Sequence, residues 1–159
     1  DEDRSDLGLI KARCLSRLGR TIQARDVYIA LTTERSTDID VWIELGMLAW
    51  ELGDFRRVAE ASTHVMKLDE TRYQGYLLRG VNERHRGRLD NAIAMFTEAA
   101  SRGEVAAPWV MLGLALNENG DVVGAREAYE RALLVDPDHV HARALLQHLQ
   151  TGATAGVGS

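Results

Sequence analysis

The chain has 159 residues, of which 45% are hydrophobic and 27% are charged, and its formal net charge is −5 at pH 7. This length suits one domain or one short repeat array, and the acidic balance argues against nucleic acid as the main partner. One cysteine excludes both an intrachain disulfide and a cysteine-based metal site. No apolar run reaches the roughly 20 residues that a membrane-spanning helix requires, so direct membrane insertion is not expected.

Amphipathic segments follow one another along the whole chain. Apolar residues recur at i, i+3, i+4 and i+7, which is the spacing of a helix with one buried face. The predicted helices, in chain order, cover residues 6–18, 22–34, 39–52, 55–68, 73–86, 89–101, 107–119, 122–135 and 138–150. The last one is expected to cap the array through Val140, Ala144, Leu145 and Leu149. Residues 151–159 are rich in Gly, Ala and Thr and are predicted to be a disordered tail.

Two sets of glycines recur along the sequence. The first set is spaced by 34, 34 and 33 residues and consists of Gly19, Gly53, Gly87 and Gly120. The second set lies seven residues before its counterparts and consists of Gly46, Gly80 and Gly113. We expect the first set to end helices in a left-handed backbone conformation, and the second set to let two helices approach closely. The recurrence divides the chain into units at residues 5–38, 39–72, 73–105 and 106–139, followed by the capping helix at 138–150.

Each unit resembles the tetratricopeptide repeat (TPR), a helix–turn–helix of about 34 residues. The fourth unit carries most of the pattern, namely Trp109, Leu112, Gly113, Ala125, Tyr129, Ala132 and Pro137. The second unit keeps Trp42, Leu45 and Gly46, whereas the first is degenerate, with Gly8 in place of the Trp. The resemblance implies an all-α fold, a right-handed α–α superhelix of four repeats with a C-terminal capping helix.

The resemblance also implies that the first helix of each repeat lines a concave groove. The predicted groove residues are Leu9, Arg13, Arg17, Ile43, Met47, Trp50, Leu77, Val81, Arg84, His85, Val110, Leu114 and Asn117. Trp50 is expected to be the anchor, since Trp is enriched among binding hot spots. Arg13, Arg17, Arg84 and His85 would rim one end and select an acidic peptide. The alternative is that part of this floor is core between helices, or is filled by the terminal helix or a neighbouring molecule.

The side chains that would bind the acidic tail of a chaperone are missing. TPR proteins with that activity carry Lys, Asn and Arg at fixed groove positions, whereas here those positions hold Leu9, Arg13, Glu44, Gln74 and Leu78. Starting one repeat later also gives no clamp, because Ile43 and Met47 then occupy the first two places. A chaperone tail is therefore not an expected partner.

Other polar residues form no recognisable catalytic constellation, so no catalytic residue, cofactor or metal site is predicted. No histidine pair has the i, i+4 spacing of a helical metal site. Cys14 is expected to be buried and inert. Arg79 and Glu83 lie four residues apart at places that are usually apolar, and we expect both to be buried as an ion pair.

These observations favour a non-enzymatic scaffold that binds a peptide or a partner helix in a mostly apolar groove. The alternative is an accessory array of a larger enzyme or of a secretion or pilus-assembly machine, in which the chain could also self-associate. The chain begins with Asp1 rather than Met, so we expect a fragment or a processed form. The composition is that of a soluble protein and favours the cytoplasm over the periplasm.

Overall fold

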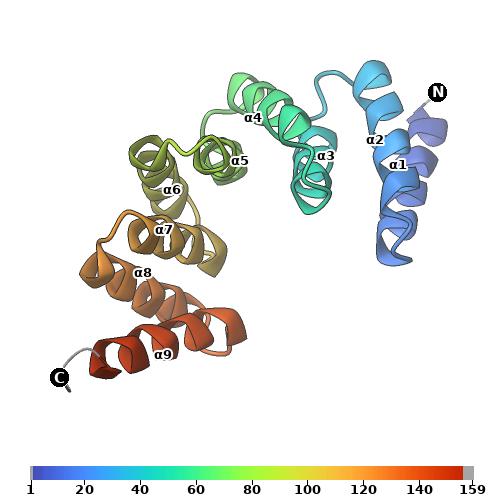
Figure 1. The fold of residues 1–159 in the computed structure, drawn as a ribbon. Coiled ribbons are helices and arrows are strands. Elements are labelled where there is room, and N and C mark those ends of the chain that lie inside the picture. The colour runs from blue at the N-terminus through green and yellow to red at the C-terminus, as the bar shows by residue number, and fades with distance from the viewer. Residues whose placement is uncertain (1, 156–159) are drawn as a thin grey trace. The chain divides into compact units, whose positions relative to one another are not determined.

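A computed structural model describes the backbone of residues 2–155 and the side chains of residues 7–151. Over the described backbone the chain is helical and contains no strand, as Figure 1 shows. The helices are α1 (Glu2–Arg17), α2 (Thr21–Glu34), α3 (Ile39–Glu51), α4 (Phe55–Leu68), α5 (Tyr73–His85), α6 (Leu89–Arg102), α7 (Ala106–Glu118), α8 (Val122–Val135) and α9 (Val140–Ala155). Every predicted helix is present, and most of the observed helix boundaries lie within one residue of the predicted ones.

The C-terminal boundary is the largest difference. Residues 151–155 were predicted to be disordered, but they belong to α9, so that prediction is wrong for this segment. The hydroxyl of Thr151 donates to the carbonyl oxygens of Gln147 and His148, one turn earlier in the same helix. Residues 156–159 lie outside the described part of the chain.

The chain divides into two compact units, residues 1–82 and residues 83–159. In the first unit α1 packs on α2, α2 on α3, and α3 on α4. In the second unit α6 packs on α7, α7 on α8, and α8 on α9. Within each unit, neighbours in sequence are therefore neighbours in space, as expected for stacked helical hairpins.

Aspartates start several of the helices. The Asp38 carboxylate accepts hydrogen bonds from the backbone N–H groups of Asp40 and Val41, at 3.1 and 3.4 Å, at the start of α3. Asp54 and Asp121 cap α4 and α8 in the same way, at 3.2 and 2.9 Å. These carboxylates satisfy backbone donors that have no partner within the helix.

The recurring glycines have the two roles that their spacing predicts. Gly19, Gly53, Gly87 and Gly120 have φ values of +71°, +70°, +73° and +85°, so each ends the first helix of its repeat in the left-handed region. Gly46 and Gly113 lie where no side chain fits. A Cβ atom on Gly46 would lie 2.8 Å from the Cβ of Ala61, and one on Gly113 would lie 2.3 Å from Cε1 of Tyr129.

An apolar cluster joins α9 to the fourth repeat. Ala106, Val110, Ala132 and Ala142 are buried together, with Trp109, Leu114, Leu133 and Leu145 packed against them. The capping helix is therefore in its predicted place. The contacting residues are only partly those predicted, because Val140 is 76% exposed and Ala144 is also exposed, whereas Ala142 is fully buried. The helix begins at Val140 rather than at residue 138, and Ala142 and Leu145 lie on the face that it buries.

Two expectations about single side chains are wrong. Cys14 is exposed, because it lies on the face of α1 opposite the buried Ala12. Arg79 is also exposed, while Glu83 is buried as expected, at 4% relative exposure. The Glu83 carboxylate contacts the guanidinium of Arg88, with an Nε–Oε2 distance of 3.0 Å, so the arginine after the turn compensates its charge.

Close approach at Gly113 can be tested by adding a methyl group. We expect Gly113→Ala to lower the free energy of unfolding by about 1–2 kcal/mol, because overpacking against Tyr129 outweighs the better helix propensity of alanine. In a Tyr129→Leu background the ring is gone, so Gly113→Ala should raise the free energy of unfolding by up to about 1 kcal/mol through its better helix propensity. Urea denaturation of the four proteins measures both effects. A stabilising Gly113→Ala in the wild-type background would contradict the tight contact.

Candidate functional site

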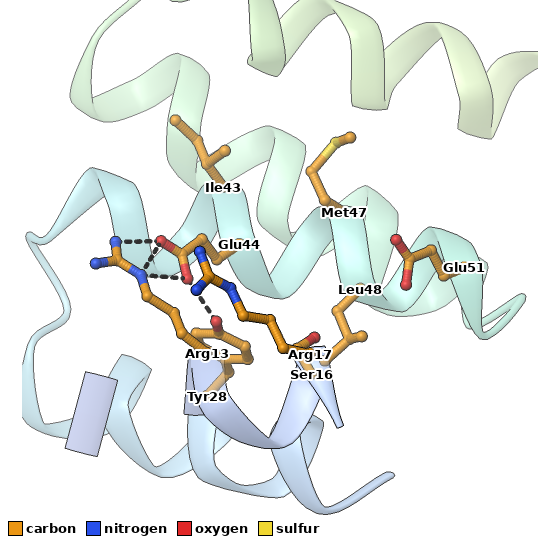
Figure 2. Close-up of a pocket in the computed structure, with 9 residues that line it drawn as sticks. All are labelled: Arg13, Ser16, Arg17, Tyr28, Ile43, Glu44, Met47, Leu48 and Glu51. Atoms are coloured by element: carbon orange, nitrogen blue, oxygen red, sulfur yellow. Dashed lines mark hydrogen bonds and ion pairs between the residues drawn. The ribbon is translucent and has the colours of Figure 1, made fainter. Parts of the chain in front are cut away.

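The first unit contains a cavity of about 360 Å³ between α1, α2 and α3, shown in Figure 2. Its wall consists of Arg13, Ser16, Arg17, Tyr28, Ile43, Glu44, Met47, Leu48 and Glu51. Helical spacing explains this set, because residues three, four, seven or eight apart share one face of a helix. Thus Arg13, Ser16 and Arg17 come from one face of α1, and Ile43, Met47 and Glu51 come from one face of α3.

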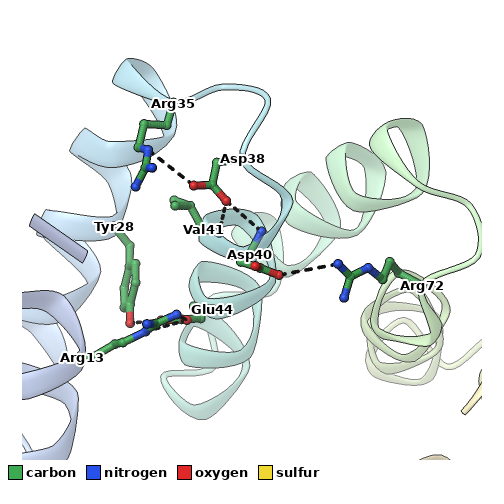
Figure 3. Close-up of polar contacts among 8 residues, drawn as sticks. All are labelled: Arg13, Tyr28, Arg35, Asp38, Asp40, Val41, Glu44 and Arg72. Carbon is green, nitrogen blue, oxygen red and sulfur yellow. Dashed lines mark hydrogen bonds and ion pairs between the residues drawn. The ribbon is translucent and has the colours of Figure 1, made fainter. Parts of the chain in front are cut away.

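Glu44 is the centre of a polar network on one side of the cavity, as Figure 3 shows. Nε of Arg13 donates to both carboxylate oxygens of Glu44, at 2.8 and 3.1 Å, and Nη2 of Arg13 donates to Oε1. The hydroxyl of Tyr28 donates to Oε2. The network therefore links α1, α2 and α3, and a two-point Arg–carboxylate contact of this kind fixes orientation as well as charge.

The network shifts the protonation equilibria of two of its members. The hydrogen bond to Glu44 raises the pKa of Arg13 above its usual value. Burial, followed by the hydrogen bond to Glu44, raises the pKa of Tyr28 well above the ordinary value for a phenol. Arg13 therefore stays charged and Tyr28 stays neutral at physiological pH, which keeps the hydrogen bonds of the network intact.

Two charged side chains of the cavity remain available. Arg17 and Glu51 are exposed, and neither forms an ion pair within residues 7–151. Ile43 and Met47 are half-buried and point the same way from α3 in Figure 2, while Leu48 is buried below. The cavity thus combines an apolar surface with one cation and one anion that no described side chain neutralises.

The predicted groove residues of the first unit are only partly brought together. Arg13, Arg17, Ile43 and Met47 line the cavity. Leu9 and Trp50 are half-buried and lie outside its lining. Leu77 and Val81 are 2% and 4% exposed, so these two side chains belong to the interior and offer almost no surface to a partner.

In the second unit the predicted residues also have different surroundings. Val110 is 5% exposed because the α8–α9 cluster covers it, and Leu114 packs against the same cluster. Nε of Arg84 donates to Oε2 of Glu118 at 2.9 Å, which raises the pKa of Arg84 and lowers that of Glu118. His85 and Asn117 are exposed. The alternative interpretation, in which part of the apolar floor is core, therefore describes Leu77, Val81 and Val110.

Sequence reasoning missed Tyr28, Glu44 and Leu48 as members of the cavity wall. Tyr28 shares its repeat position with Phe96, which has no hydroxyl, so the repeat pattern indicates no partner for the hydroxyl of Tyr28. Glu44 lies 31 residues from Arg13, so no spacing rule within one helix could pair them. The available signal was the acidic Glu44 in the first helix of the second repeat, together with the basic residues of the first helix of the first repeat.

In the described part of the chain, no group of three or more His, Cys, Asp and Glu side chains is arranged to hold a metal ion. None of the described helices combines the length and the apolar character needed to cross a membrane.

Known proteins share the helical hairpin architecture of this chain. Residues 106–139 match the tetratricopeptide repeat family. The comparison with curated proteins found no match. Among solved structures, TTC0263, a thermophilic TPR protein of Thermus thermophilus, is similar with a TM-score of 0.81 and 19% identity, over 94% of this chain and 82% of that chain.

Two other solved structures are similar at comparable identity. MamA from Desulfovibrio magneticus RS-1 gives a TM-score of 0.75 at 18% identity, over 96% of this chain and 86% of that chain. The first TPR domain of Spaghetti (RPAP3), bound to the HSP90 peptide SRMEEVD, gives a TM-score of 0.65 at 17% identity, over 73% of this chain and 93% of that chain. With its helical hairpins and its turn glycines the chain has the TPR solenoid fold, and residues 106–139, its fourth repeat, match the tetratricopeptide repeat family.

Proposed function

We propose that the chain is a non-enzymatic protein-interaction module whose first unit binds a segment of a partner protein. The observation that carries this proposal is the cavity of the first unit, whose wall includes the apolar Ile43 and Met47 together with Arg17, which has no ion pair among residues 7–151. A similar fold has been solved with a peptide bound, which supports a peptide-binding role here as well.

The charges of the cavity indicate the chemistry of the segment. Arg13 neutralises Glu44, so neither is the first choice for a partner's charge. Arg17 can instead receive an Asp or Glu of the partner, and Glu51 can receive a Lys or Arg. The expected segment is an amphipathic helix or an extended peptide that places one apolar side chain against Met47 and an acidic residue near Arg17.

Trp50 and the predicted residues of the second unit remain part of the proposal. Trp50 is half-buried, so its exposed part could still contact a long partner beyond the cavity. His85, Leu114 and Asn117 belong to the second unit and remain a predicted contact surface of that unit alone. The alternative role, as an accessory array of a larger enzyme or of a secretion or pilus-assembly machine, uses the same binding chemistry.

A displayed library of random peptides tests the binding site. We expect the wild-type chain to select peptides with an apolar residue close to an acidic one. Met47→Glu should abolish binding of a selected peptide, because it places a carboxylate in the apolar floor. Arg17→Glu should weaken it about tenfold or more, since attraction becomes repulsion. Isothermal titration calorimetry measures both affinities.

Matched variants separate the site from general charge effects. Arg56 is an exposed arginine of α4 with no ion pair in the described residues, so Arg56→Glu should leave the affinity unchanged. Trp50→Ala should weaken binding only of peptides long enough to reach past α3. Equal losses for Arg17→Glu and Arg56→Glu would reject the cavity as the binding site.

The peptide SRMEEVD provides a specificity control. We expect binding only in the millimolar range, weaker than that of the selected peptides. Leu9, Glu44 and Leu78 stand where the chaperone-binding members of the family carry amide or basic side chains, so only Arg17 of the cavity wall is left to receive the carboxylates of this peptide. Fluorescence polarisation with a labelled peptide is sufficient. Micromolar affinity would show that the chain binds acidic tails by another route.

The network around Glu44 can be tested at alkaline pH. An unfolded phenol ionises near pH 10, whereas burial and the hydrogen bond to Glu44 raise the pKa of Tyr28 in the folded chain. Above about pH 10 the unfolded state therefore binds fewer protons, and the free energy of unfolding falls as pH rises. Tyr28→Phe should show a shallower fall than wild type in urea denaturation between pH 8 and about pH 11. Burial also raises the pKa of Tyr129, so part of the fall should remain in the variant.

A further inference from the structure

Helix α1 carries a second apolar face that the repeat does not use. Leu7, Ile10 and Leu18 are 63%, 55% and 72% exposed, and Cys14 between them is exposed too. Their spacing of three, four and four residues places them along one side of α1 and of the turn that follows it. Ala12, on the opposite side, is completely buried. We call the set Leu7, Ile10, Cys14 and Leu18 the outer stripe.

Helix α9 provides a comparison. It covers the fourth repeat through Ala142 and Leu145, and its exposed face is mostly polar, with His141, Gln147 and His148 beside Val140 and Ala144. Solenoid ends need such a polar face to remain soluble on their own. A continuous apolar stripe, unlike one scattered leucine, marks a contact surface.

We propose that the outer stripe is the contact between two copies of this chain, with the two α1 helices packed antiparallel. The charge order of α1 supports this partner and this direction. The sequence of α1 places Glu2, Asp3 and Asp6 at its start with Arg4 among them, which is a net negative charge, whereas every charged residue from Lys11 to the end of α1 is basic. Lys11 and Arg20 are exposed and form no ion pair among residues 7–151. Antiparallel helices bring the acidic start of one copy beside the basic end of the other, while parallel helices bring like charges together.

The stripe is nearly symmetric about a point between Ile10 and Cys14, which suits a twofold contact. Leu7 of one copy then lies opposite Leu18 of the second copy, and Ile10 opposite Cys14. The helix has 16 residues and is about 24 Å long, so the contact is smaller than a standard interface. We therefore expect a weak dimer that depends on protein concentration.

This surface is separate from the proposed peptide site. None of the outer-stripe residues lines the cavity of the first unit, and none is among its charged residues. Dimer formation and peptide binding can therefore be measured independently, and loss of one need not alter the other.

Sedimentation velocity over a range from low to high micromolar concentration tests the dimer. Wild type should shift reversibly from monomer to dimer. Ile10→Glu should raise the dissociation constant on the order of tenfold or more, because it buries a carboxylate at the centre of the contact. Leu134→Glu is the matched control, since Leu134 is 75% exposed on α8 and should not affect dimer formation. Far-ultraviolet circular dichroism checks that both variants remain folded.

The direction of the helices can be tested with Cys14. In the antiparallel register, Ile10→Cys places a new thiol opposite Cys14 of the second copy. Oxidation by copper(II)–phenanthroline in air should then link Ile10→Cys dimers faster than wild-type dimers. A chain that stays monomeric at all concentrations, or whose dimer is equally weakened by Leu134→Glu, would overturn the proposal. Faster linkage of wild type would indicate parallel helices and would overturn it as well.

Discussion

Close contact between the two helices of a repeat is the constraint on which the rest of this structure depends. At Gly46 and Gly113 a single methyl group would overlap a neighbour, so the distance between helix axes is set by the absence of a side chain. The turn glycines then reverse the chain at the same point in each repeat. Together they hold the helices of the second and fourth repeats in close contact and fix the residue at which each of the four repeats turns.

The polar network of the first unit follows from that placement. Arg13 reaches Glu44 because α1 and α3 are held on either side of α2, and Tyr28 of α2 closes the third side. The contact orders three helices and also removes two charges from competition for a partner. The charged side chains of the cavity that remain unpaired are Arg17 and Glu51, and the proposed function uses both.

The fold could be predicted from the sequence because its determinants are local and repeated. Helix boundaries followed from apolar spacing and from the turn glycines, each of which acts within one hairpin. The site was harder to predict from the sequence. The repeat position of Leu77, Val81 or Val110 indicates which way the side chain points, but not how fully its neighbours cover it. The Arg13–Glu44 pair and the exposure of Cys14 depend on which helix faces lie against one another.

The second repeat also contains its own optical reporter. The ring centroids of Trp42 and His64 are 3.9 Å apart, and the two rings are parallel within 1°. The indole N–H of Trp42 donates to the backbone carbonyl of Ser36 at 2.9 Å. A stacked imidazole quenches indole emission, so Trp42 should be dim while α3 and α4 remain together and should brighten when they separate. Local opening of this hairpin would then be visible by fluorescence without any added label.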